Sequence, residues 1–392
     1  MTVIEANLLN HDLYTSQSEH AEFARLRRDA PIFFHPEPDG GPGFWAVMNY
    51  ELCNAVVMAP DVFLSGGGTQ ITDRRAEGKK TASVHNMDAP GHQPLRARAM
   101  PGLRRTAIAK MSDAIEKVVT DLVDACPDDT PFDFVEKVAL PLPMMVLGML
   151  LGIPEEDQPK TVDWANTITD HAQSDAAQAS ARAELFQYYR HLVDLKRDTP
   201  DDSLAASLAF GEVDDKRLSQ DELDAYFMVL TAAGNETTRF LVSGGIEQLA
   251  QLPDAADTLR RAPAGLPVAV EEMARWVTPV RLMRRTAARD TELAGHTIRA
   301  GDKVVPFFVS ANRDEAVFDA PQSFNIARKP NPHLGFGKGA HFCLGVHAAR
   351  LEAQKLFECI LARKTKIELA GPPEKMASYM FSGHSKLPIR WH

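Results

Sequence analysis

The chain has 392 residues, of which 44% are hydrophobic and 24% are charged, as in ordinary globular proteins with a sizeable buried core. Its formal net charge of -10 at pH 7 argues against a nucleic-acid-binding protein, because such proteins usually carry a basic excess. The four cysteines lack the spacing of a disulfide framework, which predicts free thiols and a cytoplasmic protein.

Neither secretion nor membrane insertion is predicted. The N-terminal segment 1–20 contains no charged stretch followed by an apolar run, so no signal peptide is expected. The most apolar segment, residues 140–153, is too short for a membrane span and is broken by prolines. We expect this segment to form a buried helix, and we expect no membrane anchor.

Helical periodicity dominates the chain. Apolar residues recur every three or four positions in residues 19–31, 92–126, 181–198 and 218–252. Strand-like alternation is shorter, and its best candidates are residues 43–50, 281–309 and 386–391. The middle one is expected to form a hairpin meander. With neither repeats nor a linker in the sequence, residues 1–392 are predicted to form a single, mostly α domain with a small β-rich lobe.

The glycine-rich stretch HLGFGKGAHFCLG, residues 333–345, is compatible with several kinds of binding site. It lacks the Gly-Lys-Ser/Thr of a phosphate loop, and no apolar strand precedes it. A zinc site remains a rival, since His333, His341, Cys343 and His347 lie close in sequence, although zinc gives no reason for the glycines. A predicted helix follows Cys343, and its N-terminal dipole would favour the thiolate. A thiolate among small residues suits axial ligation of haem iron.

Two helical pairs have the groups that a haem site would need. His92 and Arg96 are one turn apart, and such donors bind the propionate carboxylates of haem. Glu272 and Arg275 are three residues apart and would meet on one helix face. Taken alone, either pair is more simply interpreted as solvated surface residues.

The middle of the long helical segment is unusually polar. Gly234, Asn235, Thr237 and Thr238 are weak helix formers between apolar flanks. We expect the Thr237 hydroxyl to bond the carbonyl of Ala233 and to bend the helix. A tolerated kink explains the pattern, and so does a polar notch where a small molecule and protons meet.

Together these motifs resemble the cytochrome P450 family over residues 33–391. The segment FGKGAHFCLG fits the haem loop F-G-x-G-x-H-x-C-x-G at every specified position. EMAR fits E-x-x-R, AGNETT fits the oxygen-groove motif A-G-x-D/E-T-T, and GHQPLR supplies H-x-x-x-R. One departure is Ala348, where the family often has leucine. The resemblance implies the P450 fold, with haem b (iron protoporphyrin IX) between a long central helix and the proximal cysteine loop and helix.

The resemblance also implies residue roles. Cys343 would be the axial ligand of the haem iron, within a haem-binding set that also holds His92, Arg96, Arg285, His341, Phe336, Gly337 and Gly345. Arg284 competes with Arg285 for a propionate. Glu272, Arg275 and Arg328 would form a structural triad that braces the haem loop. Breaking dioxygen in an apolar pocket consumes protons, for which Glu236 and Thr237 would be the catalytic relay.

The implied reaction is hydroxylation of an apolar molecule with O2 and two electrons. The sequence contains no flavin or ferredoxin motif, so a ferredoxin and a ferredoxin reductase are expected. They would dock near Cys343, where residues 96–105 and Lys338 are basic. A thiolate-haem gas sensor or carrier without turnover stays open as an alternative, as does a P450-type peroxygenase.

The substrate pocket is expected to be apolar, which suits a terpenoid, a steroid or a fatty acyl compound. Residues 66–68 are all glycine, which suggests a mobile lid over the entrance. The segments expected to line the pocket are residues 63–73, 229–233, 280–283 and 379–384. Within them the expected contacts are Ala233, Val280, Leu282 and Met283.

Overall fold

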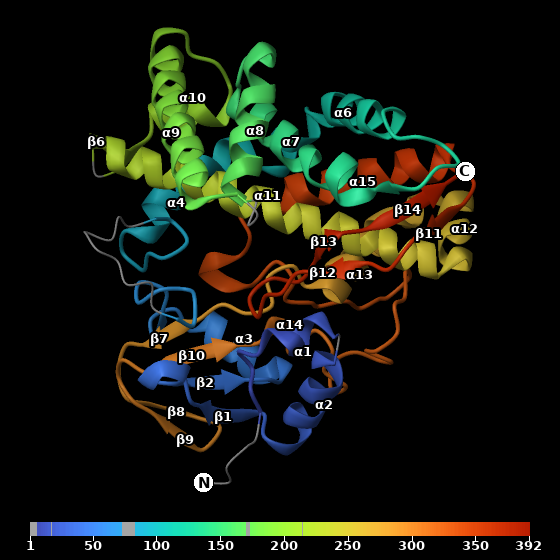
Figure 1. Ribbon diagram of the computed structural model, residues 1–392. Helices are drawn as coiled ribbons and strands as arrows, with labels where there is room; N and C mark the ends of the chain where they lie inside the picture. The colour runs from blue at the N-terminus through green and yellow to red at the C-terminus, as the bar shows by residue number, and fades with distance from the viewer. Residues whose placement is uncertain (1–5, 17, 73–82, 170–172, 214) are drawn as a thin grey trace.

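The computed structural model describes residues 6–392 except 17, 73–82, 170–172 and 214. Helices form one side of the molecule and a small β-rich lobe forms the other, as the sequence predicts (Figure 1). None of the described helices is long and apolar enough to cross a membrane.

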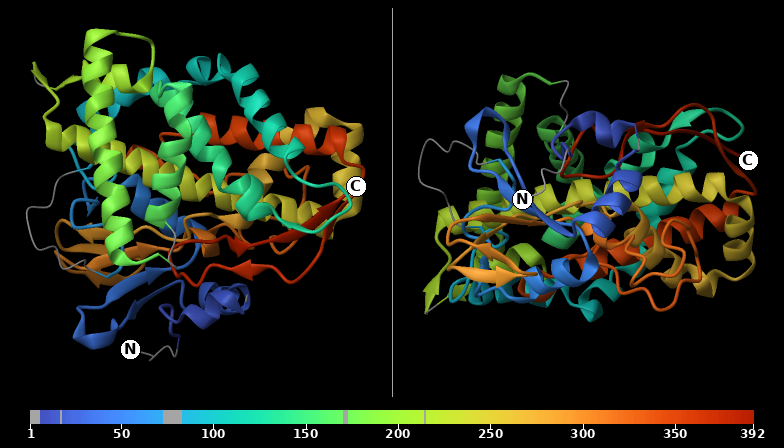
Figure 2. Two further views of the ribbon diagram at one scale, coloured as in Figure 1. Left: turned by 45° about the horizontal axis from the view of Figure 1, so that its top comes forward. Right: turned by 90° about the horizontal axis from the view of Figure 1, so that it is seen from below.

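Helix α11 (Gln220–Gln251) is the central element. It has 32 residues, which corresponds to a length of about 48 Å. It begins at a capping box in which Ser219 and Glu222 satisfy each other's backbone N–H groups. Figure 2 shows it crossing the helical side of the molecule. Its principal helical contacts are with α7 (Pro141–Leu151), α9 (Asp175–Asp198), α13 (Leu266–Val277) and α15 (Val346–Arg363).

Of two segments with a helical prediction, one forms a single helix and the other is divided into several. Residues 140–153 form α7, with Pro141 at its first position and Gly152 as a left-handed cap, so its prolines are tolerated. Residues 92–126, which have helical periodicity, form three helices: α4 (His92–Leu103), α5 (Arg105–Ala109) and α6 (Ser112–Asp124). The first break occurs because Arg104 takes an extended conformation.

The remaining helices complete this arrangement. Their bounds are α1 (His11–Thr15), α2 (Glu19–Asp29), α3 (Tyr50–Met58), α8 (Gln158–Thr169), α10 (Leu204–Ala209), α12 (Pro253–Arg261) and α14 (Phe308–Ala311). Short 3-10 or π turns are η1 (Pro38–Gly40), η2 (Val135–Ala139), η3 (Glu155–Asp157), η4 (Pro263–Gly265) and η5 (Gly339–His341).

The β-rich lobe is built on a five-stranded sheet of order β1-β2-β10-β7-β3. Its strands are β1 (Ile32–His35), β2 (Phe44–Val47), β10 (Lys303–Pro306), β7 (Arg285–Ala287) and β3 (Phe63–Leu64). Strand β10 pairs parallel with β2, and the other pairs are antiparallel. The predicted meander 281–309 therefore supplies β7 and β10, with the hairpin β8 (Thr291–Leu293) and β9 (His296–Ile298) between them.

Smaller sheets lie along the helical side. Strands β11 (Ile367–Leu369), β14 (Pro388–Trp391) and β4 (Phe132–Asp133) form one sheet, which confirms the strand predicted at 386–391. Two hairpins complete the described strands: β12 (Glu374–Lys375) with β13 (His384–Lys386), and β5 (Glu212–Val213) with β6 (Lys216–Arg217).

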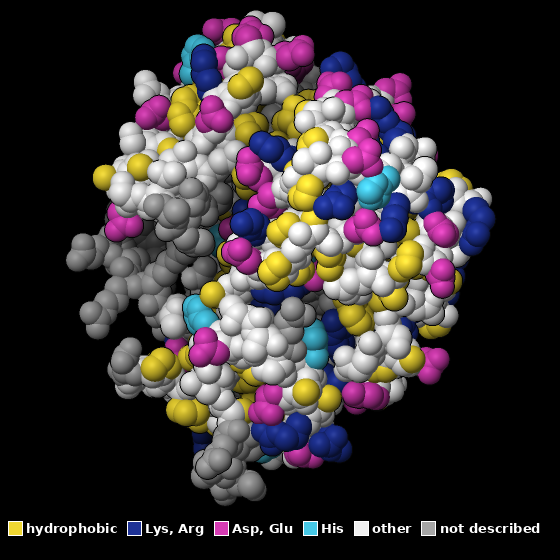
Figure 3. Space-filling view, turned by 45° about the vertical axis from the view of Figure 1, so that its right-hand side comes forward, with side chains coloured by type: hydrophobic (Ala, Val, Ile, Leu, Met, Phe, Trp, Pro, Cys, Tyr) yellow, Lys and Arg dark blue, Asp and Glu magenta, His cyan; other side chains and the backbone are white. Residues whose placement is uncertain are grey.

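Buried hydrophobic residues form one large core among the helices and two smaller clusters in the β-rich lobe. Outside the core, acidic and basic side chains are interspersed on the face shown in Figure 3.

Candidate active site

A cavity of about 280 Å³ lies between α11 and the loop 333–345, and we call it the central cavity. Its walls come from α4, α7, α11 and α15, with further residues from the β-rich lobe. Most of the lining side chains are apolar. The charged or titratable ones are His85, Arg96, Arg285, Lys338, His341, Cys343 and Glu352.

The glycines of the loop shape the lower wall of the central cavity. Gly337 and Gly339 have φ values of +66° and +70°, in the left-handed region that favours glycine. A Cβ atom at Gly339 would lie 2.7 Å from the carbonyl oxygen of Val57, so α3 packs directly against the loop. At Gly345, by contrast, a Cβ atom would meet no described atom within 4 Å. Phe336, Gly337 and Gly345 therefore border open space inside the cavity, which is the shape that a flat group requires.

Cys343 lines the central cavity and its backbone N–H donates to the Phe336 carbonyl at 2.9 Å. The helix dipole was expected to favour the thiolate. Burial instead raises the pKa of the Cys343 thiol, although the Gly345 N–H and the nearby Arg96 oppose this effect. Helix α15 begins at Val346, and Gly345 at its N-cap supplies the backbone N–H that favours the thiolate. A coordinated metal ion would favour the thiolate further, because it places a positive charge beside the sulfur.

Basic groups converge on one side of the central cavity. Arg96 donates from Nη2 to the Phe342 carbonyl at 2.5 Å, and Arg285 donates from Nη1 to the Arg284 carbonyl at 2.9 Å. Burial lowers the pKa of Arg285 to about 10, so it remains a cation at neutral pH. Burial, with the charge of Arg285 second, lowers the pKa of His341 to about 3, so His341 is neutral.

His92 and Arg284 occupy the second layer. The His92 ring lies against the His341 ring with centroids 4.1 Å apart, and its Nε2 has no hydrogen-bond partner in the described part of the chain. Arg284 does not line the cavity, because its guanidinium reaches the Gln70 carbonyl and Thr286 Oγ1. Of the two competing arginines, Arg285 is therefore the one that faces the cavity.

These residues fit a haem. Two arginines and His341 line a largely apolar space, and the only acidic side chain among the described lining residues is Glu352. Such a donor set matches a flat apolar group that carries two carboxylates. The buried Nε2 of His92 has no hydrogen-bond partner among the described residues, so it can donate to or accept from a bound group. The thiol of Cys343 and the open space at Gly345 complete the fit.

Glu272, Arg275 and Arg328 form a buried cluster rather than a surface pair. Arg275 donates to both carboxylate oxygens of Glu272 at 2.8 Å, and Arg328 Nε donates to Oε2 at 3.0 Å. The side chains of Glu272 and Arg275 have no exposed surface. Arg275 also donates to the Asn312 and Pro321 carbonyls. The cluster thus holds the segment that leads into the loop 333–345 against α13.

The two residues expected on α11 face different ways. Thr237 lines the central cavity, and its hydroxyl donates to the Ala233 carbonyl at 2.7 Å, as the sequence predicts. Helix α11 is continuous through this point. Glu236 does not line the cavity, and its carboxylate lies 3.9 Å from Arg239. The hydroxyl is at the cavity, whereas the carboxylate lies near Arg239 and outside the cavity lining.

The expected substrate contacts are only partly brought together. Ala233, Val280 and Met283 line the central cavity. Leu282 does not, which corrects the expectation. It is fully buried in the β-rich lobe and pairs with Phe307, because the bridge at this point turns its side chain to the other side of the chain.

The segment 63–73 was expected to line the pocket and to carry a mobile lid, and the structure differs on both points. Its last residue, Asp73, lies outside the described residues. The glycine part is held in place, since the Asp88 carboxylate accepts from the Ser65 and Gly66 N–H groups at 2.7 Å each. A Cβ atom at Gly67 would lie 2.2 Å from Thr286 Oγ1. The glycines therefore allow tight packing on β7 and do not form a lid. Residues 379–384 do not line the cavity either.

Two titratable residues of the cavity wall, His85 and Glu352, are absent from the sequence predictions. His85 precedes the His92 motif in a stretch without helical periodicity, which gave no signal. Glu352 lies on the apolar face of α15, one turn after Ala348, and a charged residue on a buried face was the signal that could have found it.

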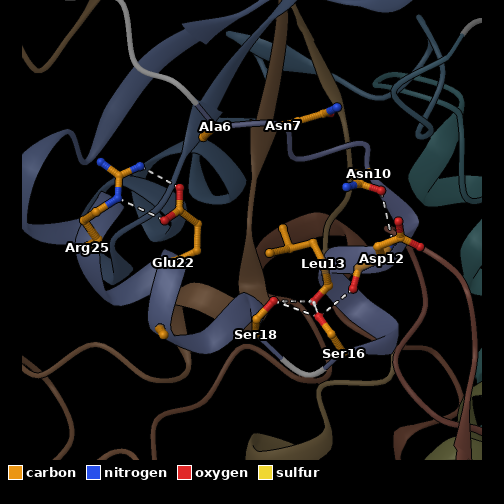
Figure 4. Close-up of a pocket in the computed structure, with 10 residues that line it drawn as sticks. Ala6, Asn7, Asn10, Asp12, Leu13, Ser16, Ser18, Glu22 and Arg25 are labelled. Atoms are coloured by element: carbon orange, nitrogen blue, oxygen red, sulfur yellow. Dashed lines mark hydrogen bonds and ion pairs between the residues drawn. The ribbon is translucent and has the colours of Figure 1, made fainter.

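A second hollow lies beside α1 and α2 (Figure 4). Its polar side chains already bind one another. Arg25 donates to both carboxylate oxygens of Glu22, and Asn10 caps α1 through the Asp12 N–H. Arg25, the one basic side chain drawn in Figure 4, is neutralised by Glu22, so we do not take the hollow as a candidate active site.

The zinc alternative fails on geometry. Within the described ranges, no three His, Cys, Asp or Glu side chains lie close enough together to hold a metal ion. His333, for example, turns away to Glu271 at 3.2 Å.

Comparison with known proteins decides the family. A family model for cytochrome P450 matches residues 266–382. The methyl-branched lipid omega-hydroxylase of Mycobacterium tuberculosis is 36% identical over 386 residues, covering 94% of this chain and 90% of the relative. The chain belongs to the cytochrome P450 family. The steroid C26-monooxygenase of Rhodococcus jostii is 34% identical, covering 96% of this chain and 83% of the relative.

The structures of known P450s agree with this assignment. A cytochrome P450 from Mycobacterium marinum in complex with pseudoionone superposes with a TM-score of 0.90 at 32% identity, covering 100% of both chains. The protein is thus a P450 monooxygenase, its cofactor is haem b, and the predicted P450 fold is confirmed.

Proposed function

We propose that this P450 hydroxylates the end of a branched apolar molecule in the central cavity, with Cys343 as the ligand of the haem iron. One observation carries the proposal. Cys343 and the basic groups Arg96 and Arg285 line the same cavity as Thr237 and an apolar wall. When bound, haem supplies the reductive activation of O2 and the insertion of one oxygen atom into a C–H bond.

The basic groups would orient the haem. Arg96, Arg285 and His341 are within the cavity wall, and His92 supports His341 from behind. Arginines match carboxylates in a bidentate geometry, so they suit the propionates. Because Arg285 is buried and remains charged, pairing it with a propionate would remove an unfavourable isolated charge.

Thr237 and Glu236 would handle protons. The Thr237 hydroxyl is a polar group of α11 at the largely apolar cavity wall, and its Oγ1 can hold a proton there. Glu236, on the same turn of α11, would pass protons inward from solvent by leaving Arg239. The two residues would thus form a relay across α11.

The substrate class follows from the cavity and the relatives. Val229, Leu230, Ala233, Val280 and Met283 give the cavity an apolar wall. One relative is a methyl-branched lipid omega-hydroxylase, and another is a steroid C26-monooxygenase. Carbon 26 of a steroid is at the end of its branched side chain, so both names describe oxidation of a branched aliphatic terminus. Within the wider class of terpenoids, steroids and fatty acyl compounds, such a terminus is our choice.

A ferredoxin and a ferredoxin reductase, acting in the cytoplasm, would deliver the electrons. Arg104, Arg105 and Lys338 are exposed, and Lys338 lies in the cysteine loop. Met58 and Phe342 are large apolar side chains that are 50% and 37% exposed, and Met58 packs beside Gly339 of that loop. Basic and apolar groups around the loop would suit an acidic electron carrier with an apolar contact surface.

The deciding experiment is the difference spectrum of the reduced protein with carbon monoxide. We expect the red-shifted Soret band of thiolate-ligated haem, and we expect Cys343→Ser to lose it. The matched control is Cys359→Ser, which removes another thiol from the adjoining helix and should keep the band. A band that survives Cys343→Ser would refute the proposed ligand.

Substrate and electron source need separate tests. Binding of methyl-branched fatty acids, steroids and terpenes can be screened by the change that each compound causes in the haem spin state. Turnover of a positive compound is then compared between NADH with ferredoxin and reductase, and hydrogen peroxide alone. Product formation only with hydrogen peroxide would replace the monooxygenase with the peroxygenase alternative.

A further inference from the structure

Glu352 of α15 is a buried carboxyl that the functions above do not use. Only 4% of its surface is exposed, and its Oε2 has no hydrogen-bond partner among the residues that the structure describes. Burial raises the pKa of Glu352 to about 8. A carboxylate without a base or a donor is costly to bury, so Glu352 is a neutral carboxylic acid at pH 7.

This acid lines the central cavity beside the small side chain of Ala348. Both residues line the cavity, and they are one turn apart on the same face of α15. Residue 348 is the place where the sequence departs from the leucine common in the family. The methyl group of Ala348 leaves the neighbouring space open, whereas a leucine would fill it beside the carboxyl.

The surroundings of Glu352 are otherwise apolar. Leu147 and Leu150 of α7 and Leu241 of α11 line the same cavity, and both helices contact α15. Desolvation is the one cause of the pKa shift of Glu352, so the titratable cavity residues His85, Arg96, Arg285, Lys338, His341 and Cys343 do not contribute.

Charged groups on the helices packed against α15 have other contacts. Glu271 of α13 pairs with Arg350, Glu116 of α6 pairs with Lys355, and Arg260 of α12 donates to the Leu361 carbonyl. On α11, Glu236 is near Arg239 and Glu247 pairs with Lys375, while Arg105 of α5 is exposed.

We propose that Glu352 is a proton-exchanging acid of the haem site, which reaches water in the central cavity through the gap at Ala348. At neutral pH it keeps this wall uncharged. Above neutral pH, where it is ionised, it takes up one proton from solvent water when an external reductant delivers the first electron to the haem. The electron and the proton together leave the charge of the site unchanged. This inference rests on the proposed haem site.

The first test is difference infrared spectroscopy of the holoprotein across pH 8. We expect the C=O stretch of a protonated carboxylic acid below that pH and its loss above it. Glu352→Gln keeps the side-chain volume and should abolish the band. Glu358→Gln, an exposed position on the same helix, is the matched control and should keep it. An acid band that is identical in Glu352→Gln would overturn the proposal.

The second test is the reduction potential of the haem, titrated with dithionite. In the wild-type protein and in Glu358→Gln, we expect the potential to fall as pH rises through the midpoint of the infrared band. In Glu352→Gln the potential should show no inflection there. An inflection of the same size in Glu352→Gln would refute the coupling between Glu352 and the haem.

The third test concerns the gap. In Ala348→Leu we expect the acid band to persist, but its shift on transfer to D2O should become at least tenfold slower. Equal exchange in Ala348→Leu and wild type would refute the gap as the route for water. These readouts need no substrate, and the carbon monoxide spectrum separately tests the haem site, so the two proposals can fail independently.

Discussion

The buried cluster at Glu272 allows a stringent test of what holds the cysteine loop. Glu272 accepts hydrogen bonds from the side chains of Arg275, Arg328 and Asn331 and from the Asn325 N–H. In Glu272→Gln, the amide nitrogen would face guanidinium donors, and two buried cations would lose their counter-charge. Breaking one buried ion pair in this way costs about 3–5 kcal/mol. Carbonyl acceptors of the two arginines offset part of this cost, so we expect the lower end of the range.

The assay is urea unfolding of the holoprotein, followed by circular dichroism and by haem absorbance. We expect the haem signal of Glu272→Gln to be lost at a lower urea concentration than its helical signal, because the cluster supports the loop locally. Asp121→Asn, which removes an exposed ion pair with Lys117, should leave both transitions nearly unchanged. A loss of less than about 1 kcal/mol in Glu272→Gln would refute the reasoning, since exposed pairs contribute that much.

Three further predictions concern protons, electron delivery and pH. Thr237→Ala should retain haem and substrate binding but divert NADH electrons into hydrogen peroxide, with a loss of product formation of about 10²-fold; an unchanged product yield per NADH would exclude the relay. Reversing Arg104 and Arg105 to glutamate should raise the KM for ferredoxin while dithionite still reduces the haem, and unaffected turnover would count against the docking surface. Ion pairing with His333 and Arg350 outweighs burial and lowers the pKa of Glu271 to about 2, so this stabilisation is complete above pH 4.5 and is lost as pH falls toward 2. Acid unfolding of Glu271→Gln should therefore depend less on pH in this window, and an unaltered acid limb would contradict the pairing.

The parts of the molecule that the sequence predicts well have local causes. The long helix at 218–252 follows from its apolar spacing and the Ser219 cap, and α11 has nearly these bounds. The cysteine loop follows from glycines at fixed offsets, because the left-handed backbone at Gly337 and Gly339 restricts those positions whatever surrounds them. Local constraints of this kind can be inferred from sequence alone.

The failures depend on contacts between distant segments. Leu282 is apolar and lies beside two cavity residues, and only the pairing with Phe307 turns it into the β-rich lobe. The glycines at 66–68 resemble a flexible lid, yet Thr286 of β7 and Asp88 hold them in place. The raised pKa values of Cys343 and Glu352 were equally hidden, because desolvation is set by the whole fold rather than by neighbouring residues.

Helix α13 explains how the ends of the cysteine loop are fixed. Two adjacent carboxylates on this helix point in different directions. Glu272 binds Arg328, which precedes the loop, and Glu271 binds Arg350 of α15, which follows it. Cys343 lies between these two anchors in sequence, so both chain segments that lead to its sulfur are held on one rigid element. Weakening either anchor should shift the thiolate relative to the haem, whereas weakening both should free the cysteine loop from α13. The double variant Glu271→Gln/Glu272→Gln should therefore lose haem faster than the sum of the two single effects predicts.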